Sequence, residues 1–506
     1  MTAPFPVRGP IRRVVIAGGG TAGWLAAAAL SRQLGRLIQV TLIESDEIGT
    51  VGVGEATIPT IRRFHEIAGV DERAFMAATG ATYKLGIAFE GWGQAGDRYV
   101  HSFGTLGRGT WLGDFHHFWL EARANGFGGD IGEYCAEHQA GLAGRYGAGG
   151  DPELSYAFHL DATAYARHLR GLSEAAGATR IEGRIAEVRR DARTGDIAAL
   201  ALGDGRVVEG DLFLDCTGFR ALLMADTLGI GYVDWGHWLP TDRALAVQTP
   251  AMLAPPPLTR ARAHHAGWGW RIPLRHRVGN GIVYASAHLS DDAAHDLLLT
   301  GVEGEPLGTP RLIRYRTGRR EQAWAANCIA LGLSSGFVEP LESTSLHLVM
   351  TGVTRLLQCF PFDGIADAVR ARFNDQARVE LEGVRDFVIL HYHLNRRTEP
   401  FWADRRETAV PDTLAARIAL FAEAGHAYQD ADELFRVDSW VQVMLGQRIA
   451  PRAHHRMAGI MGDTRLRQVL ETMRGDIARR VAALPTHDAF LAAHRPLDRA
   501  AARQAG

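Results

Sequence analysis

One residue type is almost missing from this sequence, and its single occurrence is a candidate for chemistry. Lysine and arginine together number 55, but lysine occurs only at position 84, which leaves 55 minus 1, or 54, arginines. On an exposed surface the two cations often serve equally well. A buried ammonium, unlike a guanidinium, can lose its proton and act as a proton donor or a nucleophile. We therefore treat Lys84 as a candidate functional residue; the alternative is a surface lysine that survives by accident.

A glycine-rich segment near the N-terminus predicts a nucleotide site. Residues Gly18 to Gly23 read Gly-Gly-Gly-Thr-Ala-Gly, and they follow a β-branched run from Arg12 to Ala17. An alanine-rich helix is expected to run from this turn to about Leu34. A second expected strand, Ile38 to Ile43, leads directly into Glu44. Strand, glycine turn, helix and strand in this order are typical of a dinucleotide-binding fold.

The individual residues of this unit have expected duties at a bound nucleotide. We expect Gly18 to make the tight turn, Gly20 to let the backbone approach a pyrophosphate, and Gly23 to allow close helix packing. The helix N-terminus would face the negatively charged phosphates. Glu44 can accept hydrogen bonds from the adenosine ribose hydroxyls. The motif by itself does not distinguish NAD from FAD.

A later segment favours FAD. Ile185 to Arg190, Ile197 to Leu202 and Arg206 to Val208 are expected to form a small antiparallel meander with tight turns. The meander leads directly into Asp211 to Gly218, an apolar strand that ends in an aspartate and a glycine. A late meander that returns a strand to the nucleotide fold resembles FAD-dependent monooxygenases rather than simple dehydrogenases.

The C-terminal third changes character. Apolar periodicity predicts long helices at Leu346 to Gln358, Arg370 to Leu390, Pro411 to Ala424 and Arg465 to Leu484. We therefore predict an α/β protein with an FAD-binding, Rossmann-like domain of the monooxygenase type at residues 1–345. A substrate-lining insertion would occupy about residues 85–160. A mainly helical substrate-side domain, residues 346–506, would pack on the FAD domain.

Composition excludes several classes of protein. The apolar fraction is 46%, the charged fraction is 22% and the net charge is only -2, as in an ordinary globular protein that binds neither nucleic acid nor a membrane. The four cysteines are scattered without CxxC spacing, which argues against zinc and against a disulfide framework. Neither a signal peptide nor a transmembrane run is expected, so we predict a cytoplasmic protein. No histidine pair forms a recognised ligand set, and no metal is predicted.

Three further motifs narrow the prediction. They are Gly-Val-Gly-Glu-Ala-Thr-Ile-Pro at 52–59, Gly-Trp-Gly-Trp-Arg-Ile-Pro at 267–273, and Ser-Ser-Gly-Phe-Val-Glu-Pro-Leu-Glu-Ser-Thr-Ser at 334–345. Together with the glycine turn and Tyr-Lys-Leu-Gly-Ile at 83–87, they resemble the flavin-dependent tryptophan halogenase family from Val14 to at least Gln447. The Trp-x-Trp-x-Ile-Pro element is the most specific of them, since monooxygenases of the same broad fold generally lack it.

The resemblance implies a reaction and two catalytic residues. In that family reduced FAD, oxygen and a halide give hypohalous acid, which travels through an internal channel to a separate substrate. Lys84 would hydrogen-bond this acid or form a haloamine with it. Glu342 matches the essential glutamate of the family, which would orient the oxidant and stabilise or deprotonate the cationic aromatic intermediate. Without the motif, Glu342 could be a helix-start residue that complements the helix dipole.

The resemblance also implies binding residues. The halide would lie at the backbone amides of Thr344 and Ser345; halogenases that act on free tryptophan usually have glycine in place of Ser345. Trp268 and Trp270 would close the space beside the flavin, although both could be ordinary core residues. Substrate contacts are expected from His101, Phe103 and Ser343. FAD contacts are expected from Gly18, Gly20, Thr21, Ala22, Gly23, Glu44, Glu55, Ala56, Ile185, Asp215, Leu333 and Leu346.

The substrate and the partner follow from two further observations. Tryptophan halogenases hold the charged end of the amino acid with polar and tyrosine residues, whereas residues 438–445 contain no paired tyrosines. Indole, another electron-rich arene or a larger tryptophan-containing molecule fits as well as free tryptophan. Since no second nucleotide fold is apparent, we expect a separate flavin reductase to supply reduced FAD. The alternatives are an FAD-dependent aromatic monooxygenase and a non-catalytic flavin-binding protein.

Overall fold

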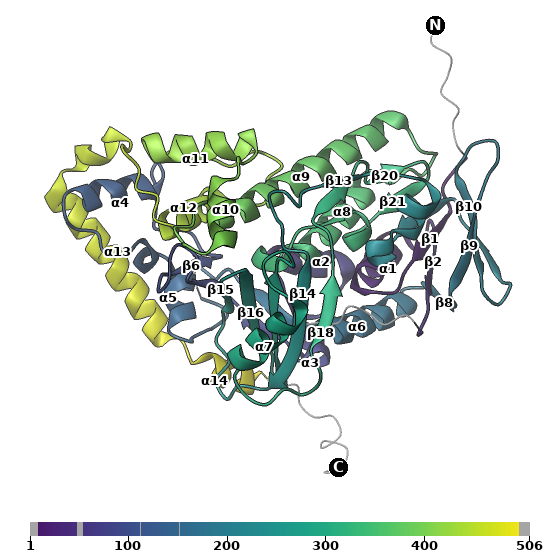
Figure 1. Ribbon diagram of the computed structural model, residues 1–506, viewed down its shortest axis with the longest axis horizontal. Helices are drawn as coiled ribbons and strands as arrows, with labels where there is room; N and C mark the ends of the chain where they lie inside the picture. Colours follow the sequence, from purple (N-terminus) through teal and green to yellow (C-terminus); the bar gives the residue numbers. More distant parts are fainter. Residues whose placement is uncertain (1–8, 48–53, 112, 151, 495–506) are drawn as a thin grey trace, which may run out of the picture.

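The computed structural model describes residues 9–47, 54–111, 113–150 and 152–494, and a parallel β-sheet organises its N-terminal part (Figure 1). All neighbouring strands of this sheet are parallel except the edge pair β20 and β21. Its six strands, in spatial order, are β20 (Trp324–Ala325), β21 (Cys328–Ala330), β12 (Leu212–Asp215), β1 (Arg13–Ala17), β2 (Gln39–Glu44) and β8 (Thr179–Glu182).

Both faces of this sheet are covered, which explains the apolar run in β1. Val14 and Ile16 belong to the core cluster that includes helix α1 (Thr21–Leu34), whereas Val15 and Ala17 belong to a cluster on the other face. Successive side chains of a strand point to opposite faces, so both halves of the run must be apolar. The second cluster is closed by the predicted meander of β9 (Ile185–Arg190), β10 (Ile197–Leu202) and β11 (Val207–Glu209).

A second large sheet forms the middle of the molecule. It is mostly antiparallel, but β15 lies parallel to β5, although these strands are far apart in the sequence. Its seven strands, in order, are β18 (Arg311–Arg314), β14 (Arg243–Pro250), β17 (Arg277–Tyr284), β16 (Gly267–Pro273), β15 (Thr259–His264), β5 (Gly86–Glu90) and β6 (Arg98–Ser102). Two three-stranded sheets flank it: β3 (Gly54–Ala56), β7 (Ala157–Asp161) and β4 (Thr82–Lys84); and β13 (Tyr232–Asp234), β19 (Gly318–Arg320) and β22 (Gly336–Phe337).

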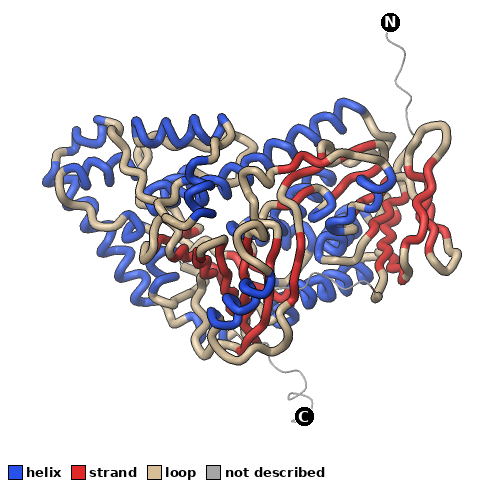
Figure 2. The backbone as a smooth tube through the Cα atoms, viewed as in Figure 1, coloured by secondary structure: helices blue, strands red, loops and turns tan. Residues whose placement is uncertain are grey.

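Helices dominate the side of the molecule away from the parallel sheet, on the left in Figure 2. Besides α1, the helices that precede α8 are α2 (Thr60–Ala68), α3 (Glu72–Thr79), α4 (Phe115–Ala124), α5 (Ala136–Leu142), α6 (Ala162–Ala175) and α7 (Asp291–Gly301). The C-terminal helices are α8 (Ser345–Gln358), α9 (Asp367–His393), α10 (Pro400–Glu407), α11 (Asp412–Ala424), α12 (Val437–Gly446), α13 (Asp463–Ala483) and α14 (His487–Ala493). None of the helices in the described ranges combines the length and the apolar character that a membrane crossing needs.

The C-terminal helices contact both large sheets. Helix α8 packs on α1 and shares the core of the nucleotide unit, whereas residues of α9, α11, α12 and α13 share a core with the seven-stranded sheet. The 27-residue helix α9 runs between these two regions, so its last turns reach the middle of the molecule (Figure 1). The predicted α/β class with a mainly helical C-terminal part is therefore confirmed.

Candidate active site

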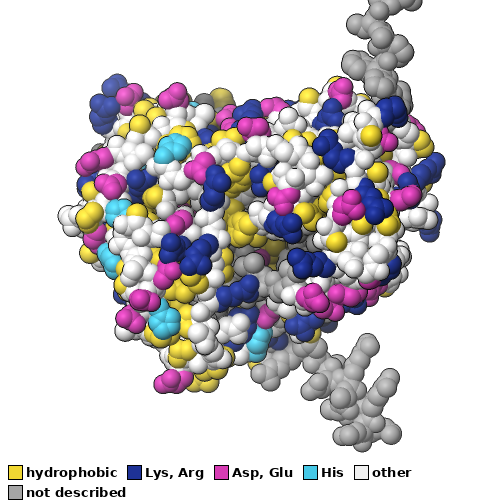
Figure 3. All heavy atoms as spheres, turned by 45° about the vertical axis from the view of Figure 1, so that its right-hand side comes forward, with side chains coloured by type: hydrophobic (Ala, Val, Ile, Leu, Met, Phe, Trp, Pro, Cys, Tyr) yellow, Lys and Arg dark blue, Asp and Glu magenta, His cyan; other side chains and the backbone are white. Residues whose placement is uncertain are grey.

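A cavity of about 600 Å³ opens at the carboxyl ends of β1 and β2, where an open parallel sheet usually binds its ligand. Its wall combines the glycine turn, the start of α8 and the Trp-x-Trp strand β16. The face turned forward in Figure 3 is hollowed near its middle, with hydrophobic side chains in the hollow and basic side chains around it. The predicted cofactor residues that line the cavity are Gly18, Gly20, Thr21, Ala22, Glu44, Glu55, Ala56, Ile185, Leu333 and Leu346.

Steric contacts explain the glycines of the turn. Gly18 has φ +108°, and a Cβ there would lie 2.3 Å from the carbonyl oxygen of Cys216. At Gly23 a Cβ would lie 1.9 Å from the carbonyl oxygen of Gly18, so the start of α1 packs directly on the turn. A Cβ at Gly20 would meet nothing within 4 Å, which leaves open space where a pyrophosphate would approach. The first turn of α1 contains no acidic residue to repel a phosphate.

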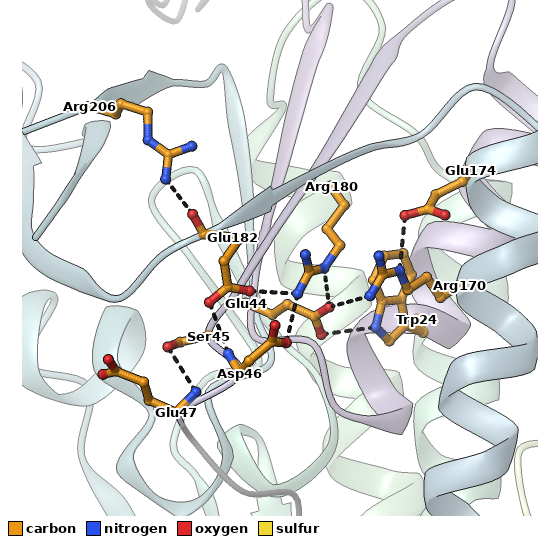
Figure 4. Close-up of polar contacts among 10 residues, drawn as sticks. All are labelled: Trp24, Glu44, Ser45, Asp46, Glu47, Arg170, Glu174, Arg180, Glu182 and Arg206. Carbon is orange, nitrogen blue, oxygen red and sulfur yellow. Dashed lines mark hydrogen bonds and ion pairs between the residues drawn. The ribbon is translucent and has the colours of Figure 1, made fainter. Parts of the chain in front are cut away.

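Glu44 lies in a network of charged residues at the far end of the cavity (Figure 4). Arg180 Nε donates to Glu44 Oε1, and Trp24 Nε1 donates to Oε2 at 3.2 Å. Arg180 also pairs with Asp46 and Glu182, and its side chain is only 14% exposed. The arrangement fixes the carboxylate in one rotamer at the edge of the cavity. It also explains Gly19, because a Cβ at that position would overlap Glu44 Oε2 at 1.6 Å.

Two of the predicted cofactor residues, Asp215 and Glu55, occupy different environments. Asp215, at the end of β12, is fully buried and accepts hydrogen bonds from Ser334 Oγ and from the amides of Leu223 and Met224. Asp215 therefore stabilises the segments behind the cavity wall and does not line the cavity itself. Glu55 reaches the cavity itself, and burial, with a smaller contribution from Asp161, raises the pKa of its carboxyl to about 7. The neighbouring Gly52 and Val53 of the predicted motif lie outside the described residues.

Lys84 is fully buried at the end of β4. Its Nζ donates hydrogen bonds to the carbonyl oxygen of Thr57 at 3.0 Å and to Ser343 Oγ at 2.8 Å. The ring of Phe103 lies 5.1 Å from Nζ, so the predicted substrate residue is next to the amine. Burial lowers the Lys84 pKa to about 7, and the negative charge of Glu342 only partly opposes this effect. The alternative of an accidental surface lysine is therefore wrong.

Glu342 is held between two histidines. His101 Nδ1 lies 2.8 Å from Oε2, and His391 Nε2 lies 2.8 Å from Oε1. His391 comes from α9 and its other ring nitrogen pairs with the Tyr99 hydroxyl at 2.8 Å. Burial would raise the pKa of Glu342, but His101 and His391 outweigh it and lower the value to about 2. The carboxylate is therefore ionised at neutral pH.

The segment between Glu342 and α8 has an unusual backbone. Ser343 has φ 59° and ψ 36°, a left-handed conformation that non-glycine residues adopt at some energetic cost. Thr344 is buried, and its Oγ1 has no hydrogen-bond partner among the described residues. Ser345 lines the cavity as the first residue of α8, whose first turn has no acidic residue and no side-chain cap. Serine is accommodated here because Ser345 itself is helical.

Trp268 and Trp270 both line the cavity from strand β16. Trp268 is 1% exposed, and its ring centroid lies 6.0 Å from that of Trp270. On its other side Trp268 packs near Trp92, which contacts His391. The pair therefore forms one wall of the cavity.

Aromatic rings lie beside His101, and the ring of Phe103 lies near Lys84. His101 lies 5.4 Å from the Phe387 ring, and Phe387 stacks on Phe435 with centroids 3.7 Å apart. Helix α12 contributes no tyrosine, and its Gln442 bonds to Ser102. The lining around Lys84 and Glu342 is therefore aromatic and suited to a flat ring.

Several residues of the site could not be identified from the sequence. His391, Tyr99, Arg180 and Trp24 carry no motif, and a histidine near the end of a helix such as α9 usually indicates only a favourable dipole interaction. Their roles follow from tertiary packing. No group of three or more His, Cys, Asp or Glu suited to a metal ion occurs in the parts of the chain that the structure describes.

Comparison with known proteins gives matches along most of the chain. A family profile described as "Tryptophan halogenase" matches residues 13–463. Tryptophan 6-halogenase SttH from Streptomyces toxytricini is 38% identical over 435 residues, which cover 80% of this chain and 83% of that protein. The solved structure of a flavin-dependent halogenase from Xanthomonas campestris is 53% identical, with a TM-score of 0.95 over 96% of this chain and 99% of that one. BrvH, a flavin-dependent halogenase from Brevundimonas sp. BAL3, is 46% identical, with a TM-score of 0.92 over 96% and 99% of the two chains.

Proposed function

Because this chain belongs to the tryptophan halogenase family, we propose that it halogenates indole or a similar electron-rich aromatic compound, with Lys84 and Glu342 as catalytic residues. Family membership confirms the predicted enzyme class, a flavin-dependent halogenase that uses reduced FAD and a halide and needs a separate flavin reductase. Family membership supports the halogenase prediction, and it supports neither an FAD-dependent aromatic monooxygenase nor a non-catalytic flavin-binding protein. The observation that carries the proposed site is the buried Lys84 amine beside Phe103.

The cavity fits the flavin cofactor. Open space at Gly20, the unopposed N-terminus of α1 and the fixed carboxylate of Glu44 suit a pyrophosphate and a ribose. Reduced FAD bound there supplies, with oxygen and halide, hypohalous acid. The amides of Thr344 and Ser345 would hold the halide beside it, because the start of α8 offers N–H groups and a favourable dipole. The Trp268 and Trp270 wall would keep the aromatic substrate away from the flavin.

Lys84 would act on the hypohalous acid as a hydrogen-bond donor. A lysine ammonium has three N–H groups, and two of them are used by Thr57 and Ser343. The third remains for the oxygen of the acid. As the ring carbon takes the halogen, the halogen–oxygen bond breaks and the ammonium proton passes to the departing hydroxide, which leaves as water. The ring proton lost in rearomatisation restores the proton of Lys84.

Glu342 would stabilise the positive charge that develops on the ring. With its pKa lowered to about 2 it is a weak base, so it acts better as a fixed negative charge than as a proton acceptor. His101 and His391 hold it in place and keep it ionised. The substrate class follows from the aromatic lining and from α12, which has no tyrosine for an amino-acid carboxylate.

The test supplies reduced FAD, oxygen and bromide or chloride with indole or free tryptophan. We expect halide-dependent product from the wild type, with a higher kcat/KM for indole than for tryptophan. Lys84→Ala and Glu342→Gln should each lose product by at least about a hundredfold while still binding FAD. Undiminished product from Lys84→Ala would overturn the catalytic assignment. A preference for tryptophan would overturn the substrate class, and oxygenated product without halide would indicate a monooxygenase.

A further inference from the structure

Two buried glutamates stand three residues apart in the turn that precedes α8. Glu339 is 0% exposed and Glu342 is 1% exposed, and the short helix η5 (Pro340–Glu342) connects them. The proposed mechanism uses only Glu342. Glu339 therefore needs an explanation, because a buried carboxyl group is costly to desolvate unless it is well hydrogen-bonded.

The partners of Glu339 are a tryptophan and a tyrosine. Trp268 Nε1 and the Tyr392 hydroxyl both donate to Oε2, each at 2.7 Å. Trp268 belongs to β16 and forms the wall beside the cavity, and Tyr392 belongs to α9. Glu339 thus joins the seven-stranded sheet, the long helix and the turn that carries Glu342.

Glu342 has the same arrangement with different partners. His101 belongs to strand β6 of the same sheet, and His391 directly precedes Tyr392 on α9. Each glutamate is therefore bridged between one residue of the sheet and one of two consecutive residues of α9. A shift of α9 at one glutamate must move the contact at the other.

The environments nevertheless shift the two pKa values in opposite directions. Glu342 is ionised between its histidines. Burial raises the pKa of Glu339 to about 7, because neutral donors from Trp268 and Tyr392 only partly offset the loss of solvent. Glu339 therefore takes up a proton more readily than Glu342, and its contacts with Trp268 and Tyr392 join β16 to α9.

We propose that Glu339 is a positioning residue for halogenation, which fixes Tyr392 and Trp268 so that His391 meets Glu342 and the wall beside the flavin cavity stays closed. This inference rests on the proposed catalytic role of Glu342. Without the carboxyl, the Trp268 N–H and the Tyr392 O–H would be buried with no acceptor, and both side chains would move. A displacement of about 1 Å at a catalytic group can cost about a hundredfold in rate.

Two substitutions at position 339 separate the effect of losing the hydrogen-bond acceptor from the effect of changing the size of the side chain. Glu339→Gln keeps an oxygen that can accept from Trp268 and Tyr392, so we expect halogenation within about threefold of wild type. Glu339→Leu has a similar size but no acceptor, so kcat should fall about 10- to 100-fold. The KM for indole should change by less than about threefold, because indole does not touch Glu339 in the proposed site. The Kd for FAD should rise by less than kcat falls, because Trp268 is only one of many residues that line the flavin cavity.

The pH profile gives a readout that a loss of stability does not move. If His391 withdraws from Glu342, the pKa of that carboxyl rises, and the acid limb of the Glu339→Leu profile moves to higher pH. Tyr392→Phe removes one hydroxyl and keeps the ring, so it should shift the limb in the same direction even if Glu339→Leu fails to fold. Glu382→Leu, which breaks the contact between α9 and Arg319 of β19, is the matched control and should leave the profile unchanged.

The outcomes distinguish this inference from the proposed function. Full kcat and an unshifted acid limb in Glu339→Leu and Tyr392→Phe would overturn the positioning role. So would a loss of FAD affinity as large as the loss of kcat, which indicates general disruption of the cavity. If Glu342→Gln remains active, the proposed function itself fails. If Glu342→Gln is inactive while Glu339→Leu is fully active, only the inference about Glu339 is wrong.

Discussion

Lys84 Nζ donates a hydrogen bond to Ser343 Oγ at 2.8 Å across 259 positions of sequence. The bond joins the end of β4 to the residue directly after Glu342. It depends on the left-handed backbone of Ser343, whose φ is 59°. Backbone strain of this kind persists where surrounding contacts outweigh it, and it is concentrated at functional sites. The strain at Ser343 thus places the proposed proton donor beside the proposed carboxylate.

Substitutions at Ser343 should separate this bond from the backbone strain. Ser343→Ala keeps the strain and removes the bond, whereas Ser343→Gly removes both. We expect both variants to lose about tenfold in kcat, because a hydrogen bond to a charged group contributes about 1.5–3 kcal/mol. Thermal unfolding should show Ser343→Gly to be the more stable variant. Steady-state kinetics with indole and calorimetry measure the two effects.

The control for this pair is another buried serine. Ser173→Ala removes a hydroxyl that bonds to the Leu169 carbonyl at 2.7 Å inside α6. It should lower stability without changing kcat. Unchanged kcat in both Ser343 variants would show that the Lys84 contact does not serve the reaction.

Halogen transfer should depend on pH through Lys84. Its pKa is lowered to about 7, so the ammonium predominates below that pH and the free amine above it. Since the proposed role requires the third N–H, the yield of halogenated indole per reduced FAD should fall as the pH rises through about 7. Product yield at saturating indole, measured together with the rate of FAD oxidation, locates the effect in the transfer step. A yield that rises over this range would instead support a haloamine formed on the free amine.

Local patterns predicted the elements that carry their own signal. The strand and glycine turn before α1, the acidic end of β2 and the three-stranded meander all lie within a residue or two of their expected bounds. The helix predicted at Leu346 to Gln358 is α8, Ser345–Gln358. These features were predictable because turn glycines and apolar periodicity act over a few residues.

Pairings between strands or residues that are far apart in the chain give no such local pattern in the sequence. Strand β15 lies parallel to β5, with Thr259 opposite Ile87, although these two strands are far apart in the sequence. In the same way, no sequence motif marks His391 as a residue of the site. It is buried, and the packing of α9 places it 2.8 Å from Glu342. From the sequence, Lys84, Glu342 and His101 could be assigned to one site only through their resemblance to family motifs.

Arg180 should determine how well the protein distinguishes FAD from flavins that lack adenosine. Its contact with Glu44 holds the carboxylate that we expect to bind the adenosine ribose. Arg180→Gln should therefore weaken FAD binding by about tenfold, since a charge-assisted hydrogen bond is lost. FMN and riboflavin have no adenosine ribose, so their affinities should stay within about twofold. Quenching of flavin fluorescence measures all three.

Two comparisons make this test specific. Arg189→Gln changes an exposed arginine of the meander, whose partner Glu187 is also exposed, and should alter none of the affinities. Equal losses for FAD, FMN and riboflavin in Arg180→Gln would mean that Arg180 supports the whole cavity and has no specific effect on the ribose end.

The buried charge of Lys84 should lower the free energy of unfolding of the protein. Burial lowers its pKa from 10.5 to about 7, so folding disfavours the ammonium relative to the unfolded chain. Below about pH 7 the residue is protonated in both states, and the full cost is present. Between about 7 and 10.5 the folded protein holds the neutral amine, and the cost decreases as the pH rises. An apolar side chain of similar length would avoid the cost of burying a charge.

Lys84→Met should therefore be inactive yet more stable than wild type by about 1–3 kcal/mol at neutral pH, as found when buried charges are replaced by apolar groups. Glu342 keeps its histidine partners in this variant, so no unpaired anion offsets the gain. Denaturant unfolding at pH 7 and near pH 10 measures the difference, which should shrink at the higher pH. Arg73→Met, at an exposed position on α3, should show neither effect. A Lys84→Met protein less stable than wild type at both pH values would mean that the hydrogen bonds to Thr57 and Ser343 outweigh the cost of burying the charge.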